Sequence, residues 1–137
     1  MAVLQELAGA WELESHQNFE AVLVELGVDD ATKPKCLRKR PTAQIEVEGT
    51  SVNLKHTGPD STVEYQIRIG QDFELTDPHS MKVIPMTANV EDDKLVYRAK
   101  EKIADSVDYV SYEIIEEKMV CTLTVNGASC KRIFRRM

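Results

Sequence analysis

Downstream of Pro41 the sequence alternates between apolar and polar residues for almost all of its remaining length. Successive side chains of a β-strand point to opposite faces, so an alternation of period two predicts strands with one apolar face. In residues 62–70, TVEYQIRIG, that face consists of Val63, Tyr65, Ile67 and Ile69. The other alternating segments are residues 43–49, 51–58, 81–90, 94–100, 106–115, 118–125 and 128–136. Short strands at this spacing, separated by turn residues, predict an antiparallel barrel or sandwich.

The residues before Pro41 predict a strand followed by a helix. Residues 9–15, GAWELES, form the strand. The helix is indicated by apolar residues at i, i+3, i+4 and i+7, which are Phe19, Val22, Leu23 and Leu26. Asn18 is its predicted N-cap, and Gly27 is the predicted residue just past its end.

A second, shorter helix is predicted within residues 29–40, with Thr32 as its N-cap and Pro34 in its first turn. Two short helices cannot form the core of so small a sheet protein. We therefore expect the pair, at about residues 18–39, to cover one end of a closed barrel that would otherwise be open to water.

The composition restricts the class of protein. The 137 residues suit a single domain, residues 1–137, and the net charge of −6 at pH 7 argues against a nucleic-acid binder. The three cysteines lack CxxC spacing, which favours reduced thiols in the cytosol over a disulfide scaffold. No apolar stretch approaches the roughly 18–20 residues needed to span a bilayer, and the first residues show no signal-peptide pattern. We expect a soluble, intracellular monomer.

The sequence contains no motif for catalysis or for a metal. His16, His56 and His79 do not have metal-ligand spacing, and no Ser or Cys lies in a nucleophile motif such as GxSxG. We therefore expect neither an enzyme nor a metal or other cofactor.

Residues spread from about 9 to 135 have the order and spacing of a known family. They are Trp11, Asn18, Phe19, Leu26, Gly27, Val28, Pro41, Leu54, Lys55, Gly70, Phe73, Lys82, Val83, the KLV of residues 94–96, Glu113, Cys130, Arg132 and Phe134. On these residues the chain resembles the intracellular lipid-binding proteins, the fatty-acid-binding and cellular retinoid-binding family. The resemblance implies an all-β fold, a ten-stranded antiparallel up-and-down β-barrel (β-clam) with a helix-turn-helix lid after the first strand. It also implies one lipophilic ligand in an internal cavity that is reached near the lid.

The family typically holds a ligand carboxylate with two arginines and a tyrosine on the last strands. The matching positions here are Tyr112, Arg132 and Phe134, so one arginine is kept and the usual tyrosine has lost its hydroxyl. Arg132 and the phenol of Tyr112 would grip a carboxylate with less charge than an arginine pair, so a neutral head group stays an alternative. Leu75 replaces a common internal glutamate, and Asp60 replaces a common portal phenylalanine.

The resemblance also implies a set of ligand contacts on the inward faces. The apolar residues that would surround the ligand are Ile45, Leu54, Ile67, Leu75, Val83, Val110 and Leu123. The further predicted contacts are Arg132, Tyr112, Phe134, Tyr65, His56 and the lid residue Phe19. For Arg132, Tyr112, Tyr65 and His56 a purely structural role inside the barrel stays open.

The segment KPKCLRKRP carries a dense run of cations in an acidic protein. These are Lys33, Lys35, Arg38, Lys39 and Arg40. The simplest interpretation is a solvated helix face. The alternatives are transient docking on anionic membranes and recognition by a nuclear-import receptor.

Three hypotheses of function follow. The first is a cytosolic carrier of a long-chain fatty acid or similar lipophilic carboxylate, which would be cytoplasmic or also nuclear. The second is a carrier of a retinoid or other neutral lipophile. The third is a membrane-associated structural or interaction protein on the same fold, with basic patches in residues 33–40 and at Arg135 and Arg136.

Overall fold

The computed structural model describes residues 2–58, 62–77 and 81–137. It contains three helices, α1 (Ala2–Leu7), α2 (Phe19–Glu25) and α3 (Lys33–Arg38). The ten strands are β1 (Gly9–Gln17), β2 (Thr42–Glu48), β3 (Ser51–Thr57), β4 (Thr62–Arg68), β5 (Asp72–Thr76), β6 (Val83–Glu91), β7 (Lys94–Ala99), β8 (Val107–Ile115), β9 (Lys118–Val125) and β10 (Ala128–Arg136). None of these helices has the length and apolar composition that a bilayer-spanning helix needs, within the described part of the chain.

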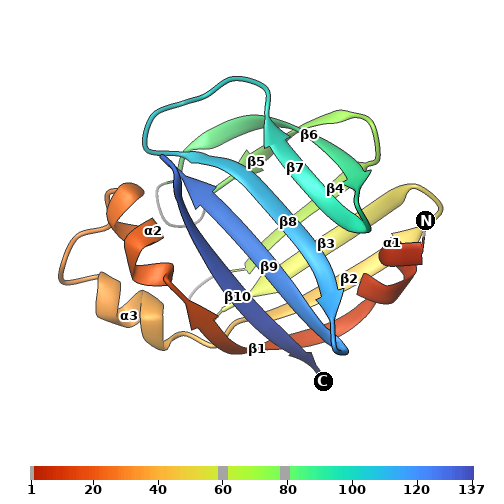
Figure 1. Ribbon diagram of the computed structural model, residues 1–137, viewed down its shortest axis with the longest axis horizontal. Helices are drawn as coiled ribbons and strands as arrows, with labels where there is room; N and C mark the ends of the chain where they lie inside the picture. The colour runs from red at the N-terminus through yellow and green to blue at the C-terminus, as the bar shows by residue number, and fades with distance from the viewer. Residues whose placement is uncertain (1, 59–61, 78–80) are drawn as a thin grey trace.

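All ten strands belong to one antiparallel sheet in the order β4-β3-β2-β1-β10-β9-β8-β7-β6-β5, which curls into a nearly closed barrel (Figure 1). Each strand pairs with its chain neighbours except at β4 and β5, between which the described residues form no ladder. The pairing of β1 with β10 joins the two ends of the chain and closes the barrel there. The predicted up-and-down barrel with a helix pair after the first strand is confirmed.

The faces of the strands agree with the alternation on β10. Cys130 and Phe134 are buried, Arg132 on the same face is partly buried, and Arg135 on the other face is exposed. On β6 the prediction was wrong for Val83, whose side chain is 51% exposed, while the neighbouring Ile84 is fully buried. Val83 therefore does not belong to the apolar lining of the barrel.

Helix α2 lies over one end of the barrel and packs against β9 and β10. It ends in a Schellman motif, because Val28 N–H donates to Leu23 O at 3.1 Å and Gly27 N–H donates to Val24 O at 3.0 Å. Gly27 has a φ of +82°, as this motif requires. Gly27 therefore ends the helix as predicted.

Asn18 and Thr32 occupy the predicted N-cap positions of the two lid helices, but neither makes a side-chain cap hydrogen bond. Asn18 has a φ of 61°, and its Nδ2 donates to Ser129 O at 2.7 Å, so it ties the lid to β10 rather than capping α2. Thr32 makes no side-chain cap hydrogen bond; instead its N–H donates to Asp29 Oδ1 at 2.7 Å.

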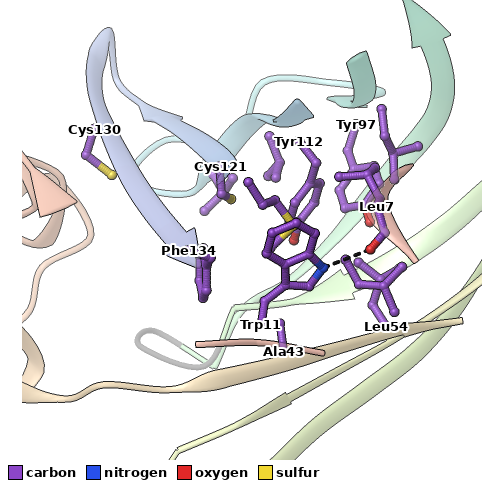
Figure 2. Close-up of a cluster of buried hydrophobic side chains, with 14 of the residues drawn as sticks. Leu7, Trp11, Ala43, Leu54, Tyr97, Tyr112, Cys121, Cys130 and Phe134 are labelled. Atoms are coloured by element: carbon purple, nitrogen blue, oxygen red, sulfur yellow. Dashed lines mark hydrogen bonds between the residues drawn. The ribbon is translucent and has the colours of Figure 1, made fainter. Parts of the chain in front are cut away.

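Helix α1 was not predicted, and it lies at the end of the barrel away from α2 and α3 (Figure 1). Val3, Leu4 and Leu7 are buried on one side of it. Their spacing along the sequence is helical, which is the signal that sequence reasoning missed. Leu7 O accepts a hydrogen bond of 2.9 Å from Trp11 Nε1, which fixes the helix on the buried indole of the first strand (Figure 2).

Arg136 fastens the same end. Its guanidinium lies 4.1 Å from the centre of the Trp11 ring and donates to Glu6 O at 2.6 Å and to Ala8 O at 3.0 Å. Gly9 leaves room for this contact, because a Cβ there would lie 2.8 Å from Arg136 Nη1. This group of α1, Trp11 and Arg136 is called the closed end below.

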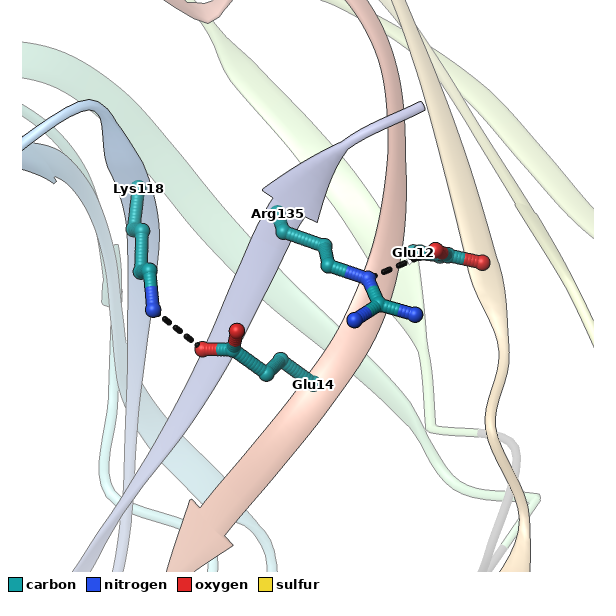
Figure 3. Close-up of polar contacts among 4 residues, drawn as sticks. All are labelled: Glu12, Glu14, Lys118 and Arg135. Atoms are coloured by element: carbon teal, nitrogen blue, oxygen red, sulfur yellow. Dashed lines mark hydrogen bonds and ion pairs between the residues drawn. The ribbon is translucent and has the colours of Figure 1, made fainter.

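Ion pairs occupy the outer face of the strands that close the barrel. Arg135 Nε lies 2.7 Å from a Glu12 carboxylate oxygen, and Lys118 Nζ lies 2.7 Å from a Glu14 carboxylate oxygen (Figure 3). Arg135 is paired with Glu12 and Arg136 donates to backbone carbonyls, but both side chains are exposed, and the basic patch at these two residues stays a prediction.

Candidate functional site

The interior holds a cavity of about 180 Å³ between the lid and the strands. Nine of the predicted ligand contacts border it, from the lid and from β3, β4, β5, β8, β9 and β10. They are Phe19, His56, Tyr65, Leu75, Val110, Tyr112, Leu123, Arg132 and Phe134. The structure therefore brings these residues together around one space, and their contact with a ligand stays a prediction.

The rest of the predicted apolar lining lies elsewhere. Ile45, Leu54 and Ile67 are buried, but the described wall of the cavity does not include them. They form part of the packed core deeper in the barrel. The sequence pattern identified which residues face inward but not which of them border the cavity.

Arg132 points into the cavity between two aromatic rings. Its guanidinium carbon lies 5.0 Å from the ring centre of Phe19 in the lid and 5.7 Å from that of Phe134. Both distances are suitable for cation–π attraction. Phe134 has lost a hydroxyl relative to the family pattern, but its ring still supports the arginine.

The polar atoms of Arg132 are not fully satisfied. Its Nε is buried and has no hydrogen-bond partner. Over residues 2–58, 62–77 and 81–137 the structure shows no ion pair to Arg132 and no hydrogen bond between Arg132 and Tyr112. A buried guanidinium without a counter-charge is costly, so this position favours an incoming acceptor or anion.

His56 lies beside Arg132 and shares a polar contact with Tyr112. Its Nε2 is 3.4 Å from the Tyr112 hydroxyl oxygen. Burial, and to a smaller extent the positive charge of Arg132, lower the pKa of His56 to about 4. The imidazole is therefore neutral at physiological pH, and Arg132 supplies the positive charge.

Tyr97 borders the cavity and was not assigned to the site by sequence reasoning. Tyr65 donates to the Tyr97 hydroxyl at 3.3 Å, and its ring stacks on Phe73 with centres 6.0 Å apart. Tyr97 is buried on the same face of β7 as Leu95, so its inward orientation follows from alternation. Alternation does not reveal that Tyr97 on β7 contacts Tyr65 on β4 across the barrel.

The cysteines lie inside the protein as thiols. Cys36, Cys121 and Cys130 are all buried, and Cys36 and Cys121 border the cavity. Burial raises the pKa of Cys121 to about 12, so its thiol stays protonated at neutral pH. Within the described residues, no group of three or more His, Cys, Asp or Glu side chains could hold a metal ion.

The predicted basic run does not form one uniform surface. Lys35, Arg38 and Arg40 are exposed, whereas Lys33 pairs with Asp30 at 2.7 Å and Lys39 borders the cavity. The exposed cations of the run therefore lie on α3 and directly after it. Asp60 and His79 lie outside the described residues.

Two known proteins are similar in sequence to nearly the whole of this chain. A fatty acid-binding protein of Tyrophagus putrescentiae is 31% identical over 131 residues, which cover 96% of this chain and 98% of that protein. Sodium/calcium exchanger regulatory protein 1 of Doryteuthis pealeii is 30% identical over 132 residues, which cover 96% of this chain and 97% of that protein.

Among solved structures, the REP1-NXSQ fatty acid transporter superposes with a TM-score of 0.87 at 28% identity, and the match covers 97% of each chain. No protein-family model matches the sequence.

Proposed function

The chain belongs to the intracellular lipid-binding proteins, the family of fatty-acid-binding and cellular retinoid-binding proteins, and we propose that it carries a long-chain fatty acid or a similar lipophilic carboxylate in its internal cavity. In this proposal the protein is a non-enzymatic, monomeric carrier in the cytosol. Fatty acids appear in the names of the Tyrophagus relative and of the superposed transporter, which supports this class of ligand.

The observation that carries the proposal is the state of Arg132. A cation lies at the cavity wall with a buried, unpartnered Nε and two aromatic neighbours. A ligand carboxylate would supply the missing acceptor and the missing negative charge together. The apolar residues Leu75, Val110 and Leu123 border the same cavity and would bury the hydrocarbon chain.

Replacing Arg132 with Gln tests the anchor. Hydrogen bonds to charged groups contribute roughly 1.5–3 kcal/mol, so the affinity for palmitate should fall by roughly tenfold to a hundredfold. The affinity for methyl palmitate should change far less, because the ester carries no charge. Isothermal titration calorimetry measures both, and Arg135→Gln on the outer face of the same strand is the matched control. Equal losses for acid and ester would remove the anchor assignment.

A second candidate is a retinoid or another neutral lipophile. It is favoured by Tyr112, which replaces the usual second arginine, and by the neutral His56 against its hydroxyl. Mass spectrometry of an organic extract from natively purified protein distinguishes the two candidates. A fatty acid in the extract supports the first candidate, and a neutral lipid supports the second.

We further propose that α3 docks transiently on anionic membranes. Lys35, Arg38 and Arg40 are exposed there, and Val24 on the adjacent helix α2 is 52% exposed. Each cation near an anionic surface contributes about 1 kcal/mol. Binding to phosphatidylserine vesicles should weaken in a variant in which Lys35, Arg38 and Arg40 are all replaced by Gln.

Other outcomes would favour the alternatives. Undiminished vesicle binding by a protein that binds no lipid ligand would favour a structural or interaction protein. Binding only to an import receptor would favour nuclear import.

A further inference from the structure

Four polar side chains from four strands meet inside the barrel and border the same cavity as Arg132. They are His56 of β3, Tyr65 of β4, Tyr97 of β7 and Tyr112 of β8, and all four border the cavity. Their rings form a continuous group, with centres 6.2 Å apart for Tyr65 and Tyr97 and 5.7 Å apart for Tyr97 and Tyr112. Figure 2 shows Tyr97 and Tyr112 next to each other inside the barrel. This group is called the phenol cluster below.

The hydrogen bonds within the phenol cluster are long. The Tyr65 and Tyr97 hydroxyls are 3.3 Å apart, and the Tyr112 hydroxyl is 3.4 Å from His56 Nε2. Hydrogen bonds between hydroxyl groups are commonly about 2.7–2.8 Å long. The contacts are therefore loose, and the four groups can rearrange around one more oxygen atom without giving up strong bonds.

The phenol cluster is also uncharged. Burial raises the pKa of Tyr65 to about 12 and raises the pKa values of Tyr97 and Tyr112 well above the ordinary phenol value. His56 is neutral because burial and the charge of Arg132 lower its pKa to about 4. The cluster thus differs in kind from Arg132, since it can exchange hydrogen bonds but cannot neutralise an anion.

A purely hydrocarbon ligand would use this wall poorly. An alkyl chain against the cluster would exclude water from three hydroxyls and offer them no partner, which is unfavourable. Each phenol oxygen accepts as well as donates, so the group has more acceptor lone pairs than protons. A ligand hydroxyl, which both donates and accepts, therefore suits it better than a carbonyl or an epoxide, which only accept.

We infer that His56, Tyr65, Tyr97 and Tyr112 form a second polar subsite that takes a hydroxyl group of the ligand, so that the preferred ligand is a hydroxylated long-chain acid. The inference rests on the proposed function, because Arg132 holds the carboxylate while the phenol cluster holds the hydroxyl. In the strand ladders, Cys121 pairs with both Tyr112 and Arg132, so these two lie in one row two strands apart. That row separates the subsites by roughly 10 Å at the backbone.

The test compares stearate with a set of monohydroxystearates that differ in the position of the hydroxyl group. A neutral hydrogen bond contributes about 0.5–1.5 kcal/mol, so the best isomer should bind roughly three- to tenfold more tightly than stearate. In Tyr65→Phe and Tyr97→Phe the ratio between that isomer and stearate should fall toward one. Tyr109→Phe is the matched control, because Tyr109 lies under the guanidinium of Arg98 and is not part of the described cavity wall. Calorimetry measures each affinity, and circular dichroism checks that each variant folds.

The outcomes separate the two proposals. If stearate binds through Arg132 but every hydroxy isomer binds no more tightly, the subsite is overturned and the proposed function stands. A preference that survives in both Phe variants overturns the assignment to the phenol cluster. If neither stearate nor any monohydroxystearate binds, the proposed function and the subsite fail together.

Discussion

Two arginines on the inner face of β10 have opposite surroundings. Arg136 at the closed end lies against Trp11 and donates to two backbone carbonyls. Arg132 at the lid end lies against Phe19 and Phe134, and its buried Nε has no partner. The residue type, strand and aromatic support are the same, but the protein supplies backbone acceptors to the more exposed Arg136 and none to the buried Nε of Arg132. An arginine whose N–H groups have acceptors within the protein stabilises the fold. An arginine with a buried N–H that has no acceptor favours binding of a ligand that supplies one.

The largest effect that tests this comparison is expected from Trp11→Ala. The indole is fully buried, and its removal also deletes the hydrogen bond to Leu7 O and the surface under Arg136. The free energy of unfolding should fall by roughly 3–5 kcal/mol. Urea unfolding followed by circular dichroism measures it. A loss under about 1 kcal/mol would mean that the closed end does not stabilise the barrel.

A smaller, pH-dependent effect is expected at the lid end from His56. The pKa of His56 is lowered to about 4 in the folded protein and is about 6.5 in the unfolded chain. Between pH 6.5 and about 4, His56 is protonated in the unfolded chain but neutral in the folded protein. The full stability is therefore present above pH 6.5, and up to about 3 kcal/mol is lost between these two values.

Carboxylates also titrate in the lower part of that range, so the measurement is a difference. Urea unfolding of the native chain and of His56→Gln should give curves of stability against pH that diverge below pH 6.5. Parallel curves would contradict the lowered pKa.

The smallest effects come from replacing each arginine with Met in the ligand-free protein. Arg136→Met removes two hydrogen bonds and a cation–π contact and should destabilise the protein by about 1–2 kcal/mol. Arg132→Met removes an unsatisfied guanidinium from the cavity wall, so stability should be unchanged or about 1 kcal/mol higher. The thermal or urea midpoint should fall in Arg136→Met and stay the same or rise in Arg132→Met. A loss of equal size in both variants would remove the distinction.

The sequence predicted most of the sheet because alternation reports directly which face of a strand is buried. It was weaker where that signal is short or mixed. Strand β5, Asp72–Thr76, has five residues and was implied only by the family resemblance. Val83 lies in the apolar run of residues 83–86, and such a run carries no information about which residues face inward.

Most of the polar residues of the candidate site were predicted, but Tyr97 and the contacts between the residues were not. Alternation and resemblance placed Arg132, Tyr112 and His56 on inward faces, and all three border the cavity. The neutral state of His56 and its approach to Tyr112 depend on distances across the barrel, which no local pattern contains. The same holds for Tyr97, whose partner Tyr65 lies on a strand that is not its ladder neighbour.

The pairing of β1 with β10 also has a kinetic consequence. Contacts such as that between Glu12 and Arg135 join residues 123 positions apart, and pairings of such long range form slowly because the chain must first lose the entropy of a large loop. Arg132 and Arg136 reach their final surroundings only when this pairing forms. During refolding, recovery of ligand affinity should therefore coincide with the slow closing step, and partly folded molecules should expose an unpaired edge of β1.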